Sequence, residues 1–213
     1  MEYVAARTDM LELRSPIYLV TPADPSRDLH GLVAAACAGG VGMVQLRLKR
    51  VSTRDFVALA ERLLSPARTA GVPLIINDRV DVCLATGADG VHLGQEDMPV
   101  AAARGVLGAE AIIGATTQTV ELARQAQADG ASYVAVGPMF GSRVKPEKEP
   151  VGPERLAAVK AAVDVPVCGI GGITRANIGQ VAQAGADLFA VVTDIADDAE
   201  PGRAVRELLA ALP

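Results

Sequence analysis

Eight short apolar runs recur along the chain, and this rhythm constrains the fold more than any other feature of the sequence. They lie at residues 17–20, 43–46, 74–76, 90–93, 111–113, 133–136, 165–170 and 188–192. Short continuous apolar runs are typical of parallel strands that are buried on both faces. The sequence therefore predicts eight parallel strands.

The segments between these runs have the spacing of helices. Between the second and third runs, apolar residues at positions 56, 59, 60, 63 and 64 fall on one face of a helix. A short turn recurs before three of the runs, at residues 87–91, 130–134 and 185–189. In each copy a glycine is expected to end a helix in the left-handed conformation, after which a small residue and a polar one lead into the strand.

Eight strands that alternate with about eight helices predict an α/β fold, a single-domain (β/α)8 TIM barrel. We expect the barrel over residues 16–213 and an N-terminal arm at residues 1–15. No Pro/Ser-rich linker divides the chain, which favours one domain. A doubly wound open sheet is the alternative, because strand counts from sequence err by about one or two. In a barrel, the loops that follow the strands build the active site.

Composition and charge narrow the class of protein. A net charge of −5 and an aromatic content of 3% without Trp argue against a nucleic-acid partner. No apolar run reaches the roughly 18 residues of a membrane span and the start lacks a signal peptide, so we expect a soluble, cytoplasmic protein without a membrane partner. Cys37, Cys83 and Cys168 are expected to be reduced core thiols, and two histidines are too few for a His-rich zinc site. A homo-oligomer stays open.

Two aspartates follow neighbouring predicted strands. Asp78 comes directly after the third run, and Asp97 follows the fourth. If these strands are parallel neighbours, the two carboxylates meet at one rim of the sheet and repel each other unless a cation lies between them. Mg2+ suits such oxygen ligands and keeps waters and substrate phosphates as its other ligands. Two solvated loop aspartates are the alternative, but the rim of a barrel favours the magnesium site.

Cations follow two other strands. Gln45, Arg47 and Lys49 continue from the second run, and alternation places all three on the same side. An Arg and a Lys at the mouth of a barrel are costly unless an anion meets them. The loop at residues 136–146 adds Arg143 and Lys145 and has the length of a functional lid. In both places a basic loop in water is the alternative.

A second anion site is predicted on the other side of the barrel. The seventh run ends in Gly171 and Gly172 just before a helix, where paired glycines let backbone N–H groups approach a phosphate. The amides near Val192 and Thr193, after the eighth run, would complete this phosphate site, which recurs in barrels. Thr116, after the fifth run, offers a hydroxyl, with a helix N-cap as its alternative role.

The predicted site contains no credible catalytic pair of Ser and His or of Cys and His. It combines two carboxylates for a metal, cations after two strands for a polyanion, and a separate phosphate site, the phosphate cup, at the glycine pair and the amides near Val192 and Thr193. Such a set suits the displacement of a diphosphate, in which the metal and the cations stabilise the leaving group.

Several motifs occur in a fixed order: Gln45-Leu46-Arg47-x-Lys49, Asn77-Asp78, His92-Leu93-Gly94-Gln95-x-Asp97, Val136-Gly137-Pro138-x-Phe140, Lys145 and Ile170-Gly171-Gly172-Ile173. With them, the chain from Ile17 onward resembles the thiamine-phosphate synthase family of (β/α)8 enzymes. The resemblance implies a transferase that joins a pyrimidine diphosphate (4-amino-2-methyl-5-hydroxymethylpyrimidine diphosphate) to a thiazole phosphate and releases diphosphate. It also implies a dissociative reaction, in which diphosphate leaves first and the thiazole nitrogen captures the pyrimidine-methyl cation.

The resemblance also implies roles for residues at matching positions. Asp78 and Asp97 would bind Mg2+, and Arg47, Lys49 and Lys145 would stabilise the leaving diphosphate. The substrate-binding residues that it implies are Gln45, Leu46, Arg47, Leu48, Lys49, Asn77, Thr116, Ser142, Arg143, Val144, Lys145, Gly172, Val192 and Thr193.

The chain departs from the family pattern mainly in the thiazole half of the site. Ser142-Arg143-Val144 stands where the family usually has Thr-x-Thr, and Thr193-Asp194 stands where it usually has Ser-Ala. Thr116 replaces a serine and keeps the hydroxyl.

Two other functions remain as alternatives. Thiazole tautomerases share the barrel but carry a catalytic His where this chain has Gln118, and they lack the metal and diphosphate residues. A non-catalytic paralogue that binds a phosphorylated ligand is the second alternative, and the altered loop at Ser142 motivates it.

Overall fold

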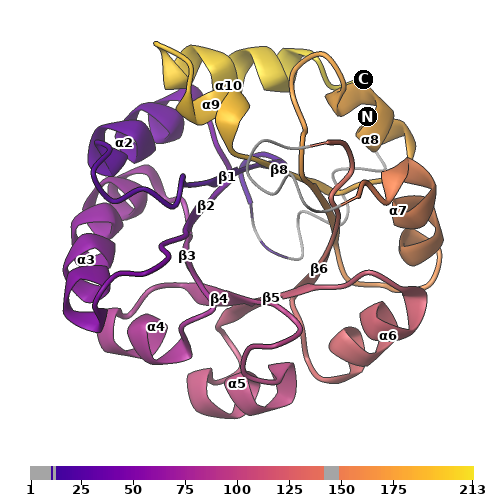
Figure 1. Ribbon diagram of the computed structural model, residues 1–213, viewed down its shortest axis with the longest axis horizontal. Coiled ribbons are helices and arrows are strands. Elements are labelled where there is room, and N and C mark those ends of the chain that lie inside the picture. Colours follow the sequence, from indigo (N-terminus) through magenta and orange to yellow (C-terminus); the bar gives the residue numbers. More distant parts are fainter. Residues whose placement is uncertain (1–10, 12, 142–148) are drawn as a thin grey trace.

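The eight predicted runs form the strands of a closed parallel barrel in the computed structural model, which describes residues 11, 13–141 and 149–213 (Figure 1). The strands are β1 (Ile17–Val20), β2 (Met43–Leu46), β3 (Leu74–Asn77), β4 (Gly90–Leu93), β5 (Ile112–Thr116), β6 (Tyr133–Val136), β7 (Val167–Ile170) and β8 (Leu188–Val191). β1 pairs with both β2 and β8, which closes the sheet. The barrel prediction is confirmed, and the open doubly wound sheet is excluded.

Helices alternate with the strands and form a ring outside them (Figure 1). They are α2 (Leu29–Gly39), α3 (Thr53–Ala70), α4 (Val80–Thr86), α5 (Val100–Leu107), α6 (Val120–Ala128), α7 (Gly152–Lys160), α8 (Ile178–Gln183), α9 (Thr193–Ala196) and α10 (Pro201–Ala210). The face predicted from residues 56–64 lies on α3, where Phe56, Ala60, Leu63 and Leu64 are buried.

Strand residues alternate between an inner and an outer core. On β1, Tyr18 and Val20 belong to the inner core, whereas Ile17 and Leu19 belong to the outer core between the strands and the helices. Because both faces of a strand are covered by apolar side chains, its sequence reads as a continuous apolar run. The same alternation decides which residues beyond each strand point into the mouth of the barrel.

The recurring turn forms hydrogen bonds to the amino ends of three strands, β3, β5 and β7. Gly87 and Gly185 have positive φ angles of 64° and 92°, as the left-handed helix end requires. The polar residue of each turn accepts a hydrogen bond from a backbone N–H of the preceding strand. The three bonds join Leu74 N to Asp89 Oδ2 at 2.8 Å, Ile113 N to Ser132 Oγ at 3.0 Å, and Val167 N to Asp187 Oδ2 at 2.8 Å.

The described end of the N-terminal arm packs against the barrel. Leu11 and Leu13 pack against the inner core. Arg14 donates from Nη1 to the carbonyl oxygen of Ala70 at 2.6 Å, and Ser15 donates from Oγ to that of Gly40 at 2.6 Å. Whether the arm ends at residue 15 stays a prediction.

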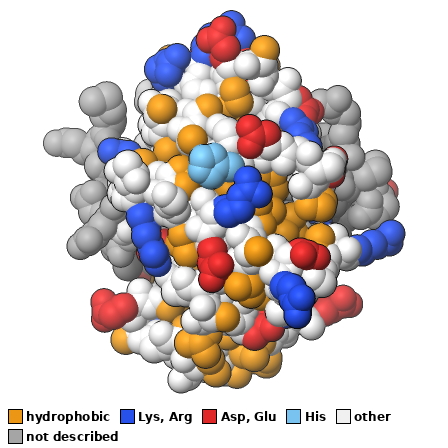
Figure 2. Space-filling model, turned by 90° about the vertical axis from the view of Figure 1, so that its left-hand side faces the viewer, with side chains coloured by type: hydrophobic (Ala, Val, Ile, Leu, Met, Phe, Trp, Pro, Cys, Tyr) orange, Lys and Arg blue, Asp and Glu red, His pale blue; other side chains and the backbone are white. Residues whose placement is uncertain are grey.

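The outer surface carries charges of both signs. On the side of the barrel covered by α2 and α3, Lys and Arg side chains are interspersed with Asp and Glu side chains, and no basic face forms there (Figure 2). Within the described residues, no helix is long and apolar enough to cross a membrane.

Candidate functional site

A cavity opens at the carboxyl ends of the strands, and residues on or just after all eight strands line it. The lining residues that the sequence predicted as site residues are Gln45, Arg47, Lys49, Asn77, Asp78, Thr116, Gly172, Val192 and Thr193. Gly171, the other glycine of the predicted phosphate site, also lines the cavity. The lining residues that the sequence did not predict as site residues are Val20, His92, Gly94, Gly137, Pro138, Ile170, Ile173 and Ala190. All of these except Val20 and Ala190 belong to the motifs that carry the family resemblance, so the motifs were the signal that could have found them.

The alternation of β2 separates the predicted residues that follow it. Gln45, Arg47 and Lys49 line the cavity, as the alternation predicted. Leu46 and Leu48, also predicted as substrate-binding residues, have side chains in the outer core and are at most 5% exposed. Any contact of these two leucines with a substrate would therefore use the backbone.

The carboxylates predicted to share one rim do lie close together. Asp78 N donates to the carbonyl oxygen of His92 at 2.8 Å, which extends the pairing of β3 with β4 one residue beyond the end of β3. Asp97 Oδ2 accepts a hydrogen bond from Gly94 N at 2.7 Å. Burial raises the pKa of Asp97, the carboxylate of Asp78 adds to this rise, and Lys49 opposes it. Two carboxylates that influence each other in this way favour a cation between them.

The backbone of Asp78 is itself unusual. Its φ angle is 66°, in the left-handed region where a side chain other than glycine costs about 1–2 kcal/mol. Backbone strain of this kind clusters at functional sites, where the surrounding structure holds it in place. The strained conformation belongs to a residue that lines the cavity beside Lys49.

The donor set at this rim fits Mg2+. No cluster of three or more His, Cys, Asp or Glu side chains that could hold a metal occurs within the described residues. Mg2+ does not need one, because it is commonly bound by one or two carboxylates together with waters and substrate phosphates. Asp78 and Asp97 supply hard oxygen atoms of the kind that this ion prefers.

Asn77 carries an unpaired polar group at the wall of the cavity. The residue is 6% exposed, and its Nδ2 atom has no hydrogen-bond partner in the part of the chain that the structure describes. A buried donor without an acceptor costs about 1–3 kcal/mol. A ligand with an acceptor atom beside Asn77 would remove this cost.

A chain of buried hydrogen bonds crosses the barrel below the cavity. Gln45 Nε2 donates to Tyr18 OH at 2.6 Å, and the hydroxyls of Tyr18 and Tyr133 are 2.9 Å apart. Tyr133 OH lies 2.9 Å from His92 Nδ1, and His92 Nε2 lies 2.9 Å from Thr116 Oγ1. Burial raises the pKa of both tyrosines, so both stay protonated at neutral pH.

Only the first bond of this chain has a fixed donor, the Gln45 amide. Either hydroxyl of the Tyr18–Tyr133 pair can donate to the other. The tautomer of His92 decides which of its ring nitrogens donates and which accepts. The inner position of Tyr133 requires Gly114, because a Cβ atom there would lie 2.1 Å from the Tyr133 Cζ atom.

Thr116 belongs to a strand and does not cap a helix. It is the last residue of β5 and lines the cavity. The N-cap of α6 is Thr119, whose Oγ1 accepts from Leu122 N at 3.2 Å. The alternative interpretation of Thr116 as an N-cap is wrong.

The predicted phosphate cup lies where the loops after β7 and β8 reach the cavity. Gly171 and Gly172 have φ angles of 95° and 67°, and a Cβ atom on Gly172 would lie 2.6 Å from the carbonyl oxygen of Gly141. The helix after them begins only at Ile178, later than the sequence indicated. Thr193 is the first residue of α9, so its N–H has no partner inside that helix. Both loops thus bring backbone to the same cavity.

The remaining predicted residues cannot be placed. Ser142, Arg143, Val144 and Lys145 lie outside the described residues. Their contribution to substrate binding stays a prediction.

Comparisons with known proteins identify the family. A family model described as thiamine monophosphate synthase matches residues 17–195. The thiamine-phosphate synthase of Roseiflexus castenholzii is 47% identical over 198 residues, which cover 92% of this chain and 87% of that one. The chain belongs to the thiamine monophosphate synthase family.

Two further members of the thiamine monophosphate synthase family agree with this assignment. The thiamine-phosphate synthase of Haloarcula marismortui is 45% identical over 202 residues, which cover 92% of this chain and 96% of that one. The solved structure of thiamine phosphate pyrophosphorylase from Pyrococcus furiosus superposes with a TM-score of 0.86 at 31% identity, covering 94% of this chain and 96% of that one. The predicted family, barrel and enzyme class, a transferase of thiamine biosynthesis, are confirmed.

Proposed function

We propose that the chain couples 4-amino-2-methyl-5-hydroxymethylpyrimidine diphosphate to a thiazole phosphate, with Mg2+ as cofactor, to give thiamine phosphate and diphosphate. The observation that carries this proposal is the closeness of Asp97, just outside the cavity lining, to Asp78 and Lys49, which line the cavity together with Arg47. Two carboxylates beside two cations suit a metal-bound diphosphate better than any singly charged ligand.

The diphosphate half of the site would stabilise the leaving group. Asp78 and Asp97 would hold Mg2+, which would supply positive charge to stabilise the leaving diphosphate. Arg47 and Lys49, joined by Lys145, would hold the diphosphate oxygen atoms by charge-assisted hydrogen bonds. No side chain needs to act as a general base, because the thiazole nitrogen itself captures the pyrimidine-methyl cation.

Neutral polar groups would orient the pyrimidine ring. Gln45, Asn77 and Thr116 all line the cavity, and Asn77 keeps an unpaired Nδ2 among the described residues. The hydrogen-bonded chain from Gln45 to Thr116 holds two of these groups in fixed orientations before substrate arrives, and such preorganisation lowers the cost of binding.

The thiazole phosphate would bind across the cavity, at the backbone of Gly172 and Thr193. Backbone N–H groups at a glycine-rich loop and at the start of a helix are common phosphate ligands. The altered loop at Ser142–Val144 would lie on this half of the site. A cytoplasmic location and a homo-oligomer stay predictions of the sequence.

A diphosphate-release assay tests the proposed function. Both substrates and Mg2+ are supplied, and each is omitted in turn. Release that needs all three components supports the synthase. Turnover of the thiazole phosphate alone would indicate a tautomerase, and tight substrate binding by calorimetry without release would indicate a ligand-binding paralogue. Full activity without a divalent ion would overturn the role of Mg2+.

A further inference from the structure

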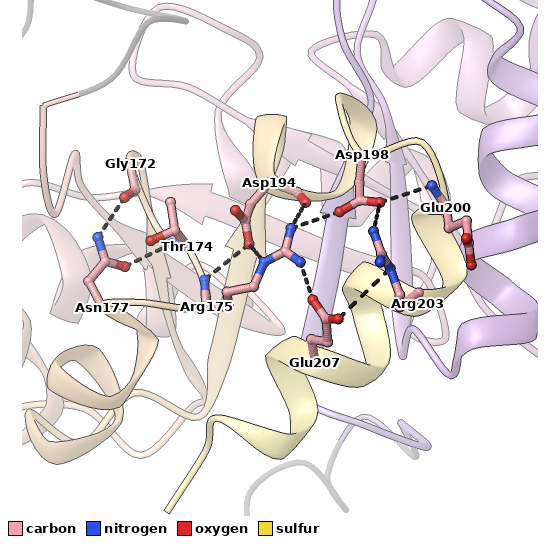
Figure 3. A network of polar contacts seen from close by, with 9 residues as sticks. All are labelled: Gly172, Thr174, Arg175, Asn177, Asp194, Asp198, Glu200, Arg203 and Glu207. Carbon is pink, nitrogen blue, oxygen red and sulfur yellow. Dashed lines mark hydrogen bonds and ion pairs between the residues drawn. The ribbon is translucent and has the colours of Figure 1, made fainter.

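Arg175 joins the loop after β7 to the segment after β8 (Figure 3). Its Nε atom donates to Asp194 Oδ2 at 3.0 Å, and its backbone N donates to the same oxygen at 3.0 Å. Its Nη2 atom donates to the Asp194 carbonyl oxygen at 3.2 Å and to Asp198 Oδ2 at 3.0 Å. Its Nη1 atom donates to Glu207 Oε2 on α10. One guanidinium thus fixes Asp194 by its side chain and by its backbone.

The joined segments are the two that carry the predicted phosphate cup. Thr193, which lines the cavity, directly precedes Asp194. Gly172, which also lines it, lies three residues before Arg175, and its carbonyl oxygen accepts from Asn177 Nδ2 at 2.9 Å. Asn177 Oδ1 in turn accepts from the backbone N of Thr174 at 2.8 Å, so the loop after β7 is fixed from both sides (Figure 3).

Arg175 is not available as a phosphate ligand. Four of the five N–H bonds of its guanidinium are used within this network. The hydrogen bonds that it donates to Asp194 and then to Asp198 raise the pKa of Arg175, so it stays charged. With Arg203 the network contains two cations and three carboxylates, a net charge of −1 that would repel a phosphate. Neither Arg175 nor Asp194 is among the residues that line the cavity.

We propose that Arg175 and Asp194 are positioning residues that set the spacing between the Gly172 and Thr193 backbones, and so the fit of the cup to the phosphate of the thiazole substrate. This inference rests on the proposed function, which assigns the cup to that phosphate. A cup made of backbone groups has no side chain that can adjust to its ligand. Its selectivity therefore depends on how firmly the two loops are held, and a displacement of about 1 Å at such a site costs up to about 100-fold in rate.

The test uses Arg175→Met, which keeps most of the side-chain length without the charge, and Asp194→Asn, which is nearly isosteric. Kinetics are measured with each substrate varied in turn. In both variants we expect the KM for the thiazole phosphate to rise about tenfold or more, because misplaced amides weaken phosphate binding. The KM for the pyrimidine diphosphate should stay unchanged, since Gln45, Arg47 and Lys49 lie on or after β2, which is separated from β8 by β1, and none of them bonds to Arg175 or Asp194 in the described residues. The double variant should be no worse than either single one.

Arg203→Met is the matched control. Arg203 pairs with the same acids, at 2.9 Å from Asp198 and 3.8 Å from Glu207, but has no contact with the loop after β7 in the described residues. It should leave both KM values unchanged. An equal effect of Arg203→Met, or an equal rise of both KM values in Arg175→Met, would overturn the inference.

Calorimetry separates this inference from the proposed function. The thiazole phosphate and the corresponding thiazole alcohol are titrated into the wild-type chain and the variants. A wild-type preference for the phosphate that is lost in Arg175→Met and Asp194→Asn supports the inference, and a preference that survives in both overturns it. A wild-type chain without any preference would instead overturn the assignment of the cup. Circular dichroism and thermal melts show whether each variant folds, and Asp194→Asn carries the test alone if Arg175→Met does not.

Discussion

Lys49 Nζ lies 2.6 Å from Asp78 Oδ2, so a cation predicted to hold diphosphate pairs with a carboxylate predicted to hold Mg2+. The side chains of the two residues are 51% and 24% exposed, and an ion pair so open to water contributes only about 0–1 kcal/mol. The pair can therefore be exchanged for bonds to a ligand at little cost. It keeps the two charges in place without binding them tightly to each other.

Lys49→Met should separate function from stability. We expect the free energy of unfolding to change by less than about 1 kcal/mol, because the pair is exposed. Diphosphate release should fall by about 100-fold or more, since one stabiliser of the leaving group is gone. Urea unfolding and the release assay measure the two effects.

Lys160→Met is the matched comparison for Lys49→Met. Lys160 pairs with Asp187 at the amino end of the barrel, where the two side chains are 11% and 3% exposed. Removal of one partner of such a buried pair costs about 3–5 kcal/mol. A larger loss of stability from Lys49→Met than from Lys160→Met would contradict this account of the two pairs.

Asp97→Asn should abolish coupling and leave the fold intact. The amide keeps the size of the side chain but removes the charge that Mg2+ needs. We expect wild-type activity to disappear with EDTA and to return with added Mg2+, and the variant to need far more Mg2+ for any residual activity. A variant with the wild-type Mg2+ dependence would show that Asp97 is not a ligand.

Asp78→Gly and Asp78→Ala should differ in stability but not in activity. Both remove the carboxylate, so both should lose diphosphate release. Glycine adopts the φ angle of 66° without strain, whereas alanine does not. We expect the glycine variant to be more stable by about 1 kcal/mol in urea unfolding. Equal stabilities would mean that the left-handed backbone at Asp78 carries no strain.

Gly114→Ala should destabilise the barrel strongly. The added methyl group would lie 2.1 Å from Tyr133 Cζ and would push the ring out of the buried hydrogen-bonded chain. Overpacking of this kind costs about 1–3 kcal/mol. Gly105→Ala on α5 is the control, because a methyl group there meets no atom within 4 Å among the described residues. It should raise the melting temperature slightly, as alanine favours a helix by about 1 kcal/mol over glycine.

Asp198→Asn should change the dependence of stability on pH. The backbone N–H of Glu200, and then Arg203 and Arg175, hold the pKa of Asp198 below its ordinary value. Its contribution to stability is therefore fully present above the unfolded carboxyl pKa of about 3.9 and is lost as the pH falls through the lower folded pKa. The gap in unfolding free energy between wild type and variant should shrink below about pH 4. A gap independent of pH would contradict the assignment.

The fold was largely predictable from the sequence because burial on both faces makes each strand an apolar run. The fifth strand shows the limit. Its run was predicted at residues 111–113, whereas β5 extends to Thr116. The inward positions beyond Ile113 are Gly114 and Thr116, a small residue that admits Tyr133 and a polar one that lines the cavity. Neither looks like part of an apolar strand.

The site was predictable where its residues follow strands in a regular way. Alternation along β2 placed Arg47 and Lys49, and the parallel pairing of β3 with β4 placed Asp78 beside Asp97. The contact between Tyr18 and Tyr133 joins residues 115 positions apart, and both had the appearance of ordinary core residues. Rules based on residue spacing along a strand or helix cannot predict a contact between residues so far apart in the sequence.

The link between Arg175 and Asp194 was unpredictable for a different reason. It depends on where two loops run and on which rotamers their side chains adopt, and the sequence pattern fixes neither. At the sequence level Asp194 appeared only as a departure from the family pattern in the thiazole half of the site. In the structure it turns out to contact Arg175 and not the cavity.

The bonds from strand N–H groups to Asp89, Ser132 and Asp187 hold strands β3, β5 and β7 at the end of the barrel that faces away from the cavity. Substitutions in the loops around the cavity leave these anchors untouched. We therefore expect that loops of a relative with a different phosphorylated substrate can be transplanted onto this chain with the strand register preserved. The barrel is a scaffold on which specificity can be redesigned at one end while folding is secured at the other.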